Sequence, residues 1–504
     1  AALRTGASRH KPAARSPQAN QLYAMLSSGV LKLAKTQCEV QEAHPWSYFK
    51  AGALLPMLGF ACEQVVAHRD AGSSVATELS IMDRYLIQVM TFIINVVGCG
   101  PYQGKTSGGD LAGDDAQDAP VKALAGEVGG VLQAFWAPDR LAGLVSAIIG
   151  GYFLLTAQDL EEWGDNPEEY YHRGDSAAWQ EGVALCAGNL YLVLLKGHTE
   201  VLAPVVMAAL QQASNACPVG TDLSTLPGPR VSAPGGGGGA LSVPLAALHK
   251  EAAYHAVALG AYELHDCVDF TPWLRAALLP ELAAQSVASR PLRRRTARVI
   301  ADWVARVEDE DRPAVYRALL GMLGEGDLCM QLTAVSALAT LIDDWNFSDA
   351  AFVEYVGPAM QLLVGLLAAA KELNSQTQAF HLVNIIIERM GDHIRPFAEP
   401  LLGLLPGLWA SAAGESLVRI QILLALQRLV NAMGAASPAS HHMVIPLLRY
   451  AMDVAQPEAI HLLEDALGLW LVALRNVPGP CVSPPSLPPG TTAQQAAQQL
   501  QAQQ

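Results

Sequence analysis

The residues that come nearest to a nucleotide-binding motif lie at 98–106, where the chain reads GCGPYQGKT. A phosphate-binding loop needs a glycine five residues before the glycine of its final Gly-Lys-Thr, and Cys99 stands at that position. The segment also follows a stretch with helical spacing (85–97) instead of a strand, and it continues into a Gly- and Asp-rich loop instead of a helix. We therefore expect no nucleotide to bind here.

Other catalytic and metal-binding patterns are missing from the sequence. It contains no HExxH, no GxSxG and no CxxC, and its eight cysteines are scattered, as in a protein with reduced thiols. His441 and His442 have no acid or cysteine at metal-ligand spacing around the pair, so we interpret them and His461 as helix-end histidines. We expect no catalytic residue, no metal and no cofactor, and hence no enzyme.

The charge balance favours protein partners over nucleic acid. The 504 residues carry a formal net charge of -15, and an acidic surface repels phosphate backbones but suits basic proteins. Hydrophobic residues make up 51% of the chain, which indicates a large buried surface. The uncharged run 141–157 contains several glycines and is followed directly by acids, so we expect a buried helix there and no membrane insertion.

Two charged segments are candidates for partner contacts. The segment DLEEWGDNPEEYY (159–171) is either a solvated connector docked by its aromatic residues or a surface for a basic partner, with contacts from Asp159, Glu161, Glu162 and Trp163. The run Arg293-Arg294-Arg295 is expected to be a solvated first helical turn. Because three cations at a helix N-terminus oppose the helix dipole, an anionic partner or an acid on a neighbouring helix would also suit it.

A repeat in the second half predicts the elements that must position these residues. Similar helix openings recur every 38 to 49 residues, at Trp273, Ala314, Phe352, Ile394 and Met443. Each is followed by a second amphipathic helix, at 293–307, 330–342, 376–390, 417–433 and 460–474. Two helices at this period are typical of HEAT repeats, and each pair has more apolar surface than it can bury by itself. The fold class is therefore all-α, an α-solenoid superhelix of HEAT-type repeats.

In such a solenoid the second helices carry the partner-facing polar stripes. We select Asp302, Glu388, Glu464 and Asp465 on these helices as further contacts for a basic partner. Pro313 suits a first helical turn, whereas Pro280, Pro400 and Pro406 lie inside first helices and are expected to bend or break them.

The expected organisation has five parts. They are a disordered lead-in (1–20), HEAT-type helical repeats (21–213) with a flexible acidic loop (103–120), a Gly/Pro-rich disordered insert (214–244), further HEAT-type repeats (245–477) and a Pro/Gln-rich disordered tail (478–504).

Several of these segments resemble the importin-β (karyopherin) superfamily. DLEEWGDNPEEYY is similar to an Asp-x-x-x-Trp-x-x-Asp-Pro-Glu-x-Tyr/Phe segment found across it. Further stretches resemble its importin-11 branch, in order along the chain: HPWSYF (44–49), KEAAYHAVALGAYELHDCVDFTPWL (250–274), RPLRRRTARVIADWV (290–304), IRPFAEPLLGLLPGLW (394–409) and QPEAIHLLEDALGLWLVAL (456–474).

The resemblance implies a nuclear transport receptor that shuttles between cytoplasm and nucleus through the nuclear pore. Such receptors carry protein cargo, here expected to be basic, bind FG-repeat nucleoporins between first helices, and release cargo when the small GTPase Ran binds in its GTP form. No segment near residue 1 resembles the family's amino-terminal domain, which supplies the main Ran contact. The chain is therefore expected to match the middle and later part of a receptor. A static HEAT-repeat scaffold or adaptor is the alternative function.

Overall fold

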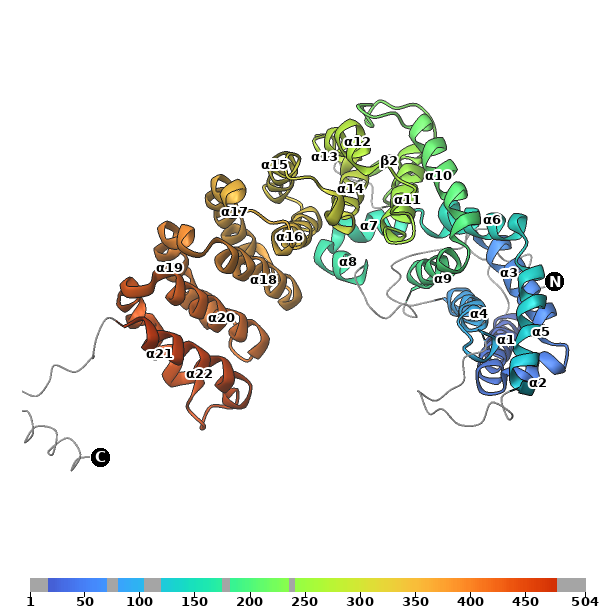
Figure 1. Ribbon diagram of the computed structural model, residues 1–504, viewed down its shortest axis with the longest axis horizontal. Helices are drawn as coiled ribbons and strands as arrows, with labels where there is room; N and C mark the ends of the chain where they lie inside the picture. The colour runs from blue at the N-terminus through green and yellow to red at the C-terminus, as the bar shows by residue number, and fades with distance from the viewer. Residues whose placement is uncertain (1–16, 70–79, 104–118, 175–181, 235–240, 478–504) are drawn as a thin grey trace, which may run out of the picture. The chain divides into compact units, whose positions relative to one another are not determined.

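The computed structural model describes residues 17–69, 80–103, 119–174, 182–234 and 241–477 (Figure 1). The described residues are almost entirely helical, apart from the short strands β1 (Arg230–Ser232) and β2 (Ser242–Pro244). They divide into two compact units, Ala1–Asn346 and Phe347–Gln504. The all-α prediction, with HEAT-type pairing of antiparallel helices, is confirmed within each unit.

Every helix pair expected after residue 270 is present. A first helix and a second helix alternate along the chain: α12 (Phe270–Trp273), a π-helical turn (Leu274–Leu278) and α13 (Leu279–Leu282) with α14 (Arg290–Asp302); α15 (Arg312–Leu323) with α16 (Leu328–Asp343); α17 (Asp349–Ala369) with α18 (Leu373–Met390); α19 (Arg395–Ser411) with α20 (Ser416–Met433); and α21 (His441–Ala451) with α22 (Ala459–Asn476).

Neighbouring pairs stack through like helices. In the second unit α18 packs on α20 and α20 on α22, while Gly357 of α17 meets the ring of Phe397 in α19. Figure 1 shows these as two layers, with α18, α20 and α22 side by side in one and α17, α19 and α21 in the other. Stacking of this kind buries the apolar faces that one pair leaves open.

The first unit opens with three further pairs. These are α3 (Leu54–Ala67) with α4 (Ile81–Val97), α6 (Pro138–Ala147) and a π-helical turn, η3 (Ile148–Tyr152), with α9 (Val183–Gly197), and α10 (Thr199–Ala216) with α11 (Leu245–Leu259). The long α1 (Pro17–Ala43) packs on α4, and α2 (Pro45–Lys50), η2 (Pro101–Gln103) and α5 (Ala119–Phe135) lie beside these pairs. Two short helices, α7 (Ala157–Asp165) and α8 (Pro167–Gly174), are inserted between η3 and α9.

The repeat is visible in how individual helices begin and end. α18 and α20 both end at a glycine with positive φ, Gly391 at 51° and Gly434 at 54°, a conformation that a Cβ atom disfavours. The side chain of Asp327 caps α16 by accepting from the Met330 N–H at 3.1 Å. The same sequence signals, placed about one repeat apart, therefore set similar helix boundaries.

The predicted faces of the second helices are largely correct. In α18, Phe380, Val383, Ile386 and Ile387 are buried, and His381 and Glu388 on the opposite face are exposed. Asn384, which was expected on the polar face, is instead buried. Its side-chain amide donates to the backbone and side-chain oxygens of Gln421 in α20 at 3.3 and 3.0 Å, and these bonds offset the cost of burial.

The prolines behave differently from one another. Pro313 lies in the first turn of α15, as predicted, and the helix that contains Pro280 is interrupted by the π-helical turn before it. Pro400 and Pro406, which were expected to bend or break their helix, do not break it, because α19 runs through both. Both prolines lie on the exposed side of α19, where water can bind the carbonyl groups that lack an N–H partner.

The expected disordered insert at 214–244 is wrong for its described residues. α10 extends to Ala216, and β1 pairs antiparallel with β2, with Val231 opposite Val243. Leu223, Leu241 and Val243 are at most 8% exposed, so apolar burial holds this segment against the first unit. Its glycine run at 235–240 lies outside the described residues.

The other expected disordered segments lie mostly outside the described residues as well. They are 1–16 of the lead-in, 104–118 of the acidic loop and the whole tail 478–504. Where they are described, residues 17–20 belong to α1, Gln103 belongs to η2, and 119–120 belong to α5. These positions correct the expected boundaries by a few residues.

Three helical stretches of the described chain are long and apolar enough to cross a membrane: Ile81–Gln103, Asp349–Ala369 and Ser416–Ala451. About half of each stretch is buried inside the protein, at 50%, 44% and 50%, because each packs within a helix pair. The uncharged run 141–157 forms most of α6 and the buried turn Ile148–Tyr152, as predicted for a buried helix. Pro138–Tyr152 and Ala157–Asp165, which are bent by 42° relative to each other, also pass the length and hydropathy test when taken together.

Candidate protein-interaction surfaces

The inserted helices α7 and α8 contain the acidic aromatic segment, and its first acid is a helix cap. Asp159 and Thr156 form a capping box: the Asp159 carboxylate accepts from the Thr156 N–H at 2.6 Å, and the Thr156 hydroxyl accepts from the Asp159 N–H at 3.2 Å. Asp159 is fully buried. Its expected role as a surface contact is therefore wrong for this structure, because its carboxylate fixes the start of α7 inside the protein.

Trp163 is internal as well, which agrees with the alternative of a connector docked by its aromatic residues and rules out Trp163 as a contact for a partner. It is 2% exposed, and its indole N–H donates to both carboxylate oxygens of Asp327 at 3.1 and 3.2 Å. Its ring stacks on that of Tyr170, with centroids 5.4 Å apart. Arg290 pairs with the same Asp327 at 3.1 Å. Trp163 thus fastens α7 to the start of α16, in the third helix pair after the one that contains the insertion.

Glu161 and Glu162 keep part of their surface. Both are half-buried, and Glu162 pairs with Arg173 of α8 at 3.4 Å. Arg173 also pairs with Glu169. Of the four contacts expected in this segment, these two glutamates are the ones that a partner can reach.

The arginine run is buried, not solvated, and it meets acids on neighbouring elements. Arg293 donates to the Leu282 carbonyl at 3.0 Å and pairs with Glu325, and Arg295 pairs with Glu251 of α11 at 2.6 Å. Burial lowers the pKa of Arg295, while Glu251 opposes that effect. The expected solvated turn is wrong, and the interhelical acids that would suit such a run are present.

Arg294 completes the attachment of α7 and α8. Its guanidinium lies over the rings of Trp163 and Tyr170, 5.9 and 5.4 Å from their centroids. The conspicuous acidic, aromatic and basic motifs of the sequence therefore form one internal cluster in the first unit. Acidic, aromatic and basic side chains attract one another, so the complementary character of these motifs is the sequence signal that could have predicted their packing together.

The four acids expected on second helices lie at the surface. Asp302, Glu388 and Glu464 are exposed, and Asp465 is half-buried. Glu388 pairs with Arg428 of α20 at 2.8 Å. Burial and then the neighbouring Glu464 raise the pKa of Asp465. Asp302 belongs to the first unit and the other three to the second.

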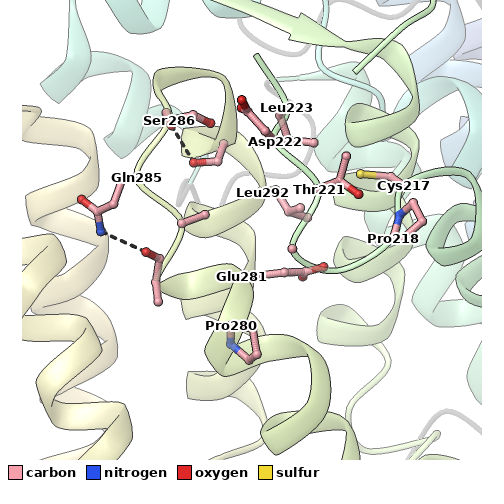
Figure 2. Close-up of a pocket in the computed structure, with 14 residues that line it drawn as sticks. Cys217, Pro218, Thr221, Asp222, Leu223, Pro280, Glu281, Gln285, Ser286 and Leu292 are labelled. Atoms are coloured by element: carbon pink, nitrogen blue, oxygen red, sulfur yellow. Dashed lines mark hydrogen bonds between the residues drawn. The ribbon is translucent and has the colours of Figure 1, made fainter. Parts of the chain in front are cut away.

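A cavity of about 310 Å³ lies between the segment after α10 and the turn from α13 to α14 (Figure 2). Beside it the fully buried Lys250 pairs with Glu281 and donates to the Cys217 carbonyl at 2.8 Å. Burial raises the pKa of the Cys217 thiol, which disfavours the reactive thiolate. The cluster is therefore suited to holding the insert in place and offers no activated nucleophile.

A larger groove of about 750 Å³ lies on the side of the first helices. It runs between α6 with its π-helical turn and α10, with α11 as its floor, and its walls are apolar and small: Ile149, Gly150, Pro204, Val205, Ala208, Ala209, Ala213 and Ala216. Such a surface suits an apolar side chain of a partner. Among the described residues, no group of three or more His, Cys, Asp or Glu side chains is placed to hold a metal.

Comparison with known proteins shows that the chain is similar to importins. The family model for importin-11-like TPR repeats matches residues 420–500. Importin-11 of Homo sapiens is 28% identical over 465 residues, which cover 91% of this chain and 43% of the human protein. The importin β-like protein KAP120 of Saccharomyces cerevisiae is 25% identical over 349 residues, which cover 67% of this chain and 32% of the yeast protein.

Among solved structures, that of Kap121p is 14% identical, with a TM-score of 0.43, and covers 88% of this chain and 46% of that one. The chain thus spans less than half the length of these relatives. The sequence similarity to the importin-11 proteins nevertheless extends over 91% of this chain.

Proposed function

We propose that this chain is part of a nuclear transport receptor that carries protein cargo through the nuclear pore and releases it under the control of Ran-GTP. The observation that carries the proposal is the alignment of 91% of the chain with importin-11. The receptor moves between cytoplasm and nucleus.

The architecture suits a carrier that must both hold and release cargo. Each helix pair contacts mainly its neighbours, so small changes at successive interfaces add up over the array. Two ligands that prefer different curvatures then compete without sharing a site, because each stabilises its own state.

The apolar groove beside α10 is the proposed docking site for a phenylalanine of an FG repeat. A phenyl ring needs an apolar recess and little else, and Val205, Ala208 and Ala209 provide one between neighbouring first helices. A single ring in a shallow groove binds weakly, which allows rapid release as the receptor moves through the pore.

The groove is tested with a synthetic FG-repeat peptide and the variant Ala209→Glu, which places a carboxylate among the apolar walls. We expect this variant to weaken peptide binding at least about tenfold, because a buried charge opposes an apolar ligand. Gln211→Glu is the matched control, since Gln211 lies on the same helix, is exposed and does not line the groove. Equal binding by both variants would rule the groove out.

Basic cargo is proposed to bind acids in each unit taken by itself: Glu161, Glu162 and Asp302 in the first unit, and Glu388, Glu464 and Asp465 in the second. The reversals Asp302→Lys and Glu388→Lys should weaken binding of a basic cargo protein, and the loss should shrink as salt is added. Glu63→Lys is the control, because Glu63 is exposed on the first helix α3. A loss of the same size in the control would remove these acids from the site.

A second set of results would favour a static scaffold instead. In a complete receptor that contains this chain, Ran-GTP should displace bound cargo. Cargo that stays bound in the presence of Ran-GTP, together with no FG-peptide binding, would contradict the transport proposal.

A further inference from the structure

The inserted helices α7 and α8 make contacts that pass over two complete helix pairs. They follow η3, in the pair formed by α6, η3 and α9, and yet α8 packs on α16 (Figure 1). The pair of α10 with α11 and the pair of α12 and α13 with α14 lie between them in the chain. The other extensive contacts among the described helices join members of one pair or of neighbouring pairs. The insertion is therefore an exception to the nearest-neighbour packing of a solenoid.

The contacts at the far end of the insertion are directional and largely buried. Trp163 of α7 is 2% exposed, and its indole N–H donates at 3.1 Å to the carboxylate of Asp327, the N-cap residue of α16. Arg290, the first residue of α14, pairs with the same carboxylate at 3.1 Å. The Asp327 side chain is itself only 9% exposed. One buried acceptor thus joins the insertion to two later helix pairs.

The insertion is also fixed at its near end and in its middle. The capping box of Thr156 and Asp159 sets the start of α7 directly after η3. The ring of Trp163 stacks on that of Tyr170, which joins α7 to α8. The guanidinium of Arg294 in α14 lies over both rings, 5.9 and 5.4 Å from their centroids. Movement of α7 relative to α8 or α14 would break these contacts.

Three interfaces between helix pairs lie along the stretch that the insertion spans, from α6 to α16. The curvature of a solenoid changes when successive pairs rotate by small angles at such interfaces. A connection fixed at both ends closes these pairs into a ring, so a rotation at one interface must be cancelled at another. We propose that α7 and α8 are a brace that holds the four helix pairs from α6 to α16 at one curvature. The proposal rests on the fold and not on the transport function.

The brace gives the two units different mechanical properties. In the first unit the second helices α9, α11, α14 and α16 keep a fixed spacing, so a ligand on their exposed faces meets a preformed surface. In the second unit the extensive contacts among α17 to α22 join only helices of one pair or of neighbouring pairs. The interfaces of the second unit are therefore free to rotate independently.

Double electron–electron resonance between spin labels measures the spread of distances in the full chain. One pair of labels is placed at Lys196 in α9 and Thr340 in α16, and the other at His381 in α18 and Glu464 in α22; all four side chains are exposed. Labels carried on keto amino acids leave the native cysteines unlabelled. Independent rotations would make the distribution across three interfaces about 1.2 times as wide as that across two, whereas the brace predicts a first-unit distribution about half as wide as the second.

Two buried tryptophans provide a matched pair of variants. Trp163→Phe removes the donor to Asp327 and should widen the first-unit distribution about twofold, because the three interfaces can then rotate independently. Trp303→Phe is the control and should leave the width unchanged. Trp303 is also 2% exposed, donates to the Val257 carbonyl at 3.2 Å and stacks on Phe270, but these contacts stay within one pair and its neighbour.

The comparison of the two units in the unaltered chain needs no variant, and circular dichroism checks that both variants stay helical. A first-unit distribution no narrower than that of the second unit overturns the proposal. Equal widening by Trp163→Phe and Trp303→Phe also overturns it, as does an unchanged width in both Trp163→Phe and Asp327→Ala.

Discussion

Asp327→Ala should release the inserted helices α7 and α8 without unfolding the solenoid. The Asp327 carboxylate has three partners: the Met330 N–H at 3.1 Å, the buried Trp163 indole at 3.1 Å, and Arg290 at 3.1 Å. It therefore joins the insertion to a helix pair that lies more than 150 residues later in the sequence. Removing the carboxylate takes a cap from α16 and a hydrogen-bond partner from Trp163 in the insertion.

The magnitude follows from the three contacts. Losing the cap of α16 costs about 1 kcal/mol, and leaving the indole N–H buried without a partner costs about 1–3 kcal/mol. The pair with Arg290, whose side chain is 31% exposed, contributes at most about 1 kcal/mol. The three share one group and are not additive, so we expect about 3 kcal/mol in all. Asp327→Asn keeps an oxygen for the cap and the indole and should cost less than about 1 kcal/mol.

Hydrogen exchange followed by mass spectrometry measures this locally. In Asp327→Ala the amides of 157–174 should exchange about 5- to 100-fold faster, the ratio that corresponds to the loss of about 1–3 kcal/mol from the contact with the Trp163 indole. The amides of α18 and α20, in the other unit, should be unchanged. Unaltered protection of 157–174, or an equal effect of the alanine and asparagine variants, would refute the role assigned to Asp327.

Three further outcomes are expected. Phe380→Ala, at a side chain 1% exposed in α18, should lower the free energy of unfolding of the second unit by about 3–5 kcal/mol in urea titrations, and a loss below 1 kcal/mol would contradict its place in the core. Glu281→Leu should destabilise the first unit by about 3–5 kcal/mol because Lys250 stays buried and charged without its partner. Lys250→Met combined with Glu281→Leu should recover most of this lost stability. If the double variant recovers none of it, the unpaired charge is not the cause. Burial, and after it the charges of Arg295, Arg298 and Arg294, hold the pKa of His255 well below 6.5. As pH falls below about 6.5 the unfolded chain therefore binds a proton at His255 before the folded chain does, and the first unit should lose stability. If the stability of the wild type falls no more steeply with pH than that of His255→Gln, this prediction is wrong.

The helix pairs could be predicted because their signals are local. Apolar residues at helical spacing, capping residues and Gly391 and Gly434 at helix ends each act within one or two turns. The prolines of α19 were harder, because whether Pro400 breaks a helix depends on which side of it faces water. That side is set by the packing of neighbouring pairs, which the local sequence does not contain.

The charged motifs were misplaced for a related reason. Asp159, Trp163 and Arg294 look like surface residues because charged and amphipathic side chains usually are. In the structure Trp163 and Arg294 have partners far away in the sequence, Asp327 for Trp163 and the rings of Trp163 and Tyr170 for Arg294, whereas Asp159 is buried as part of a local capping box with Thr156. Pairing over such distances is not encoded in spacing. By contrast, Glu388 and Glu464 were placed correctly because helical periodicity decides which face they occupy.

Entry into nuclei tests the transport proposal most directly. The fluorescently labelled chain is added to permeabilised cells beside an inert protein of equal size, with the groove variant Ala209→Glu as a third sample. Binding to FG repeats predicts that the chain enters faster than the inert protein and collects at the nuclear rim, and that Ala209→Glu removes both effects. Entry no faster than that of the inert protein, with no signal at the rim, would contradict it.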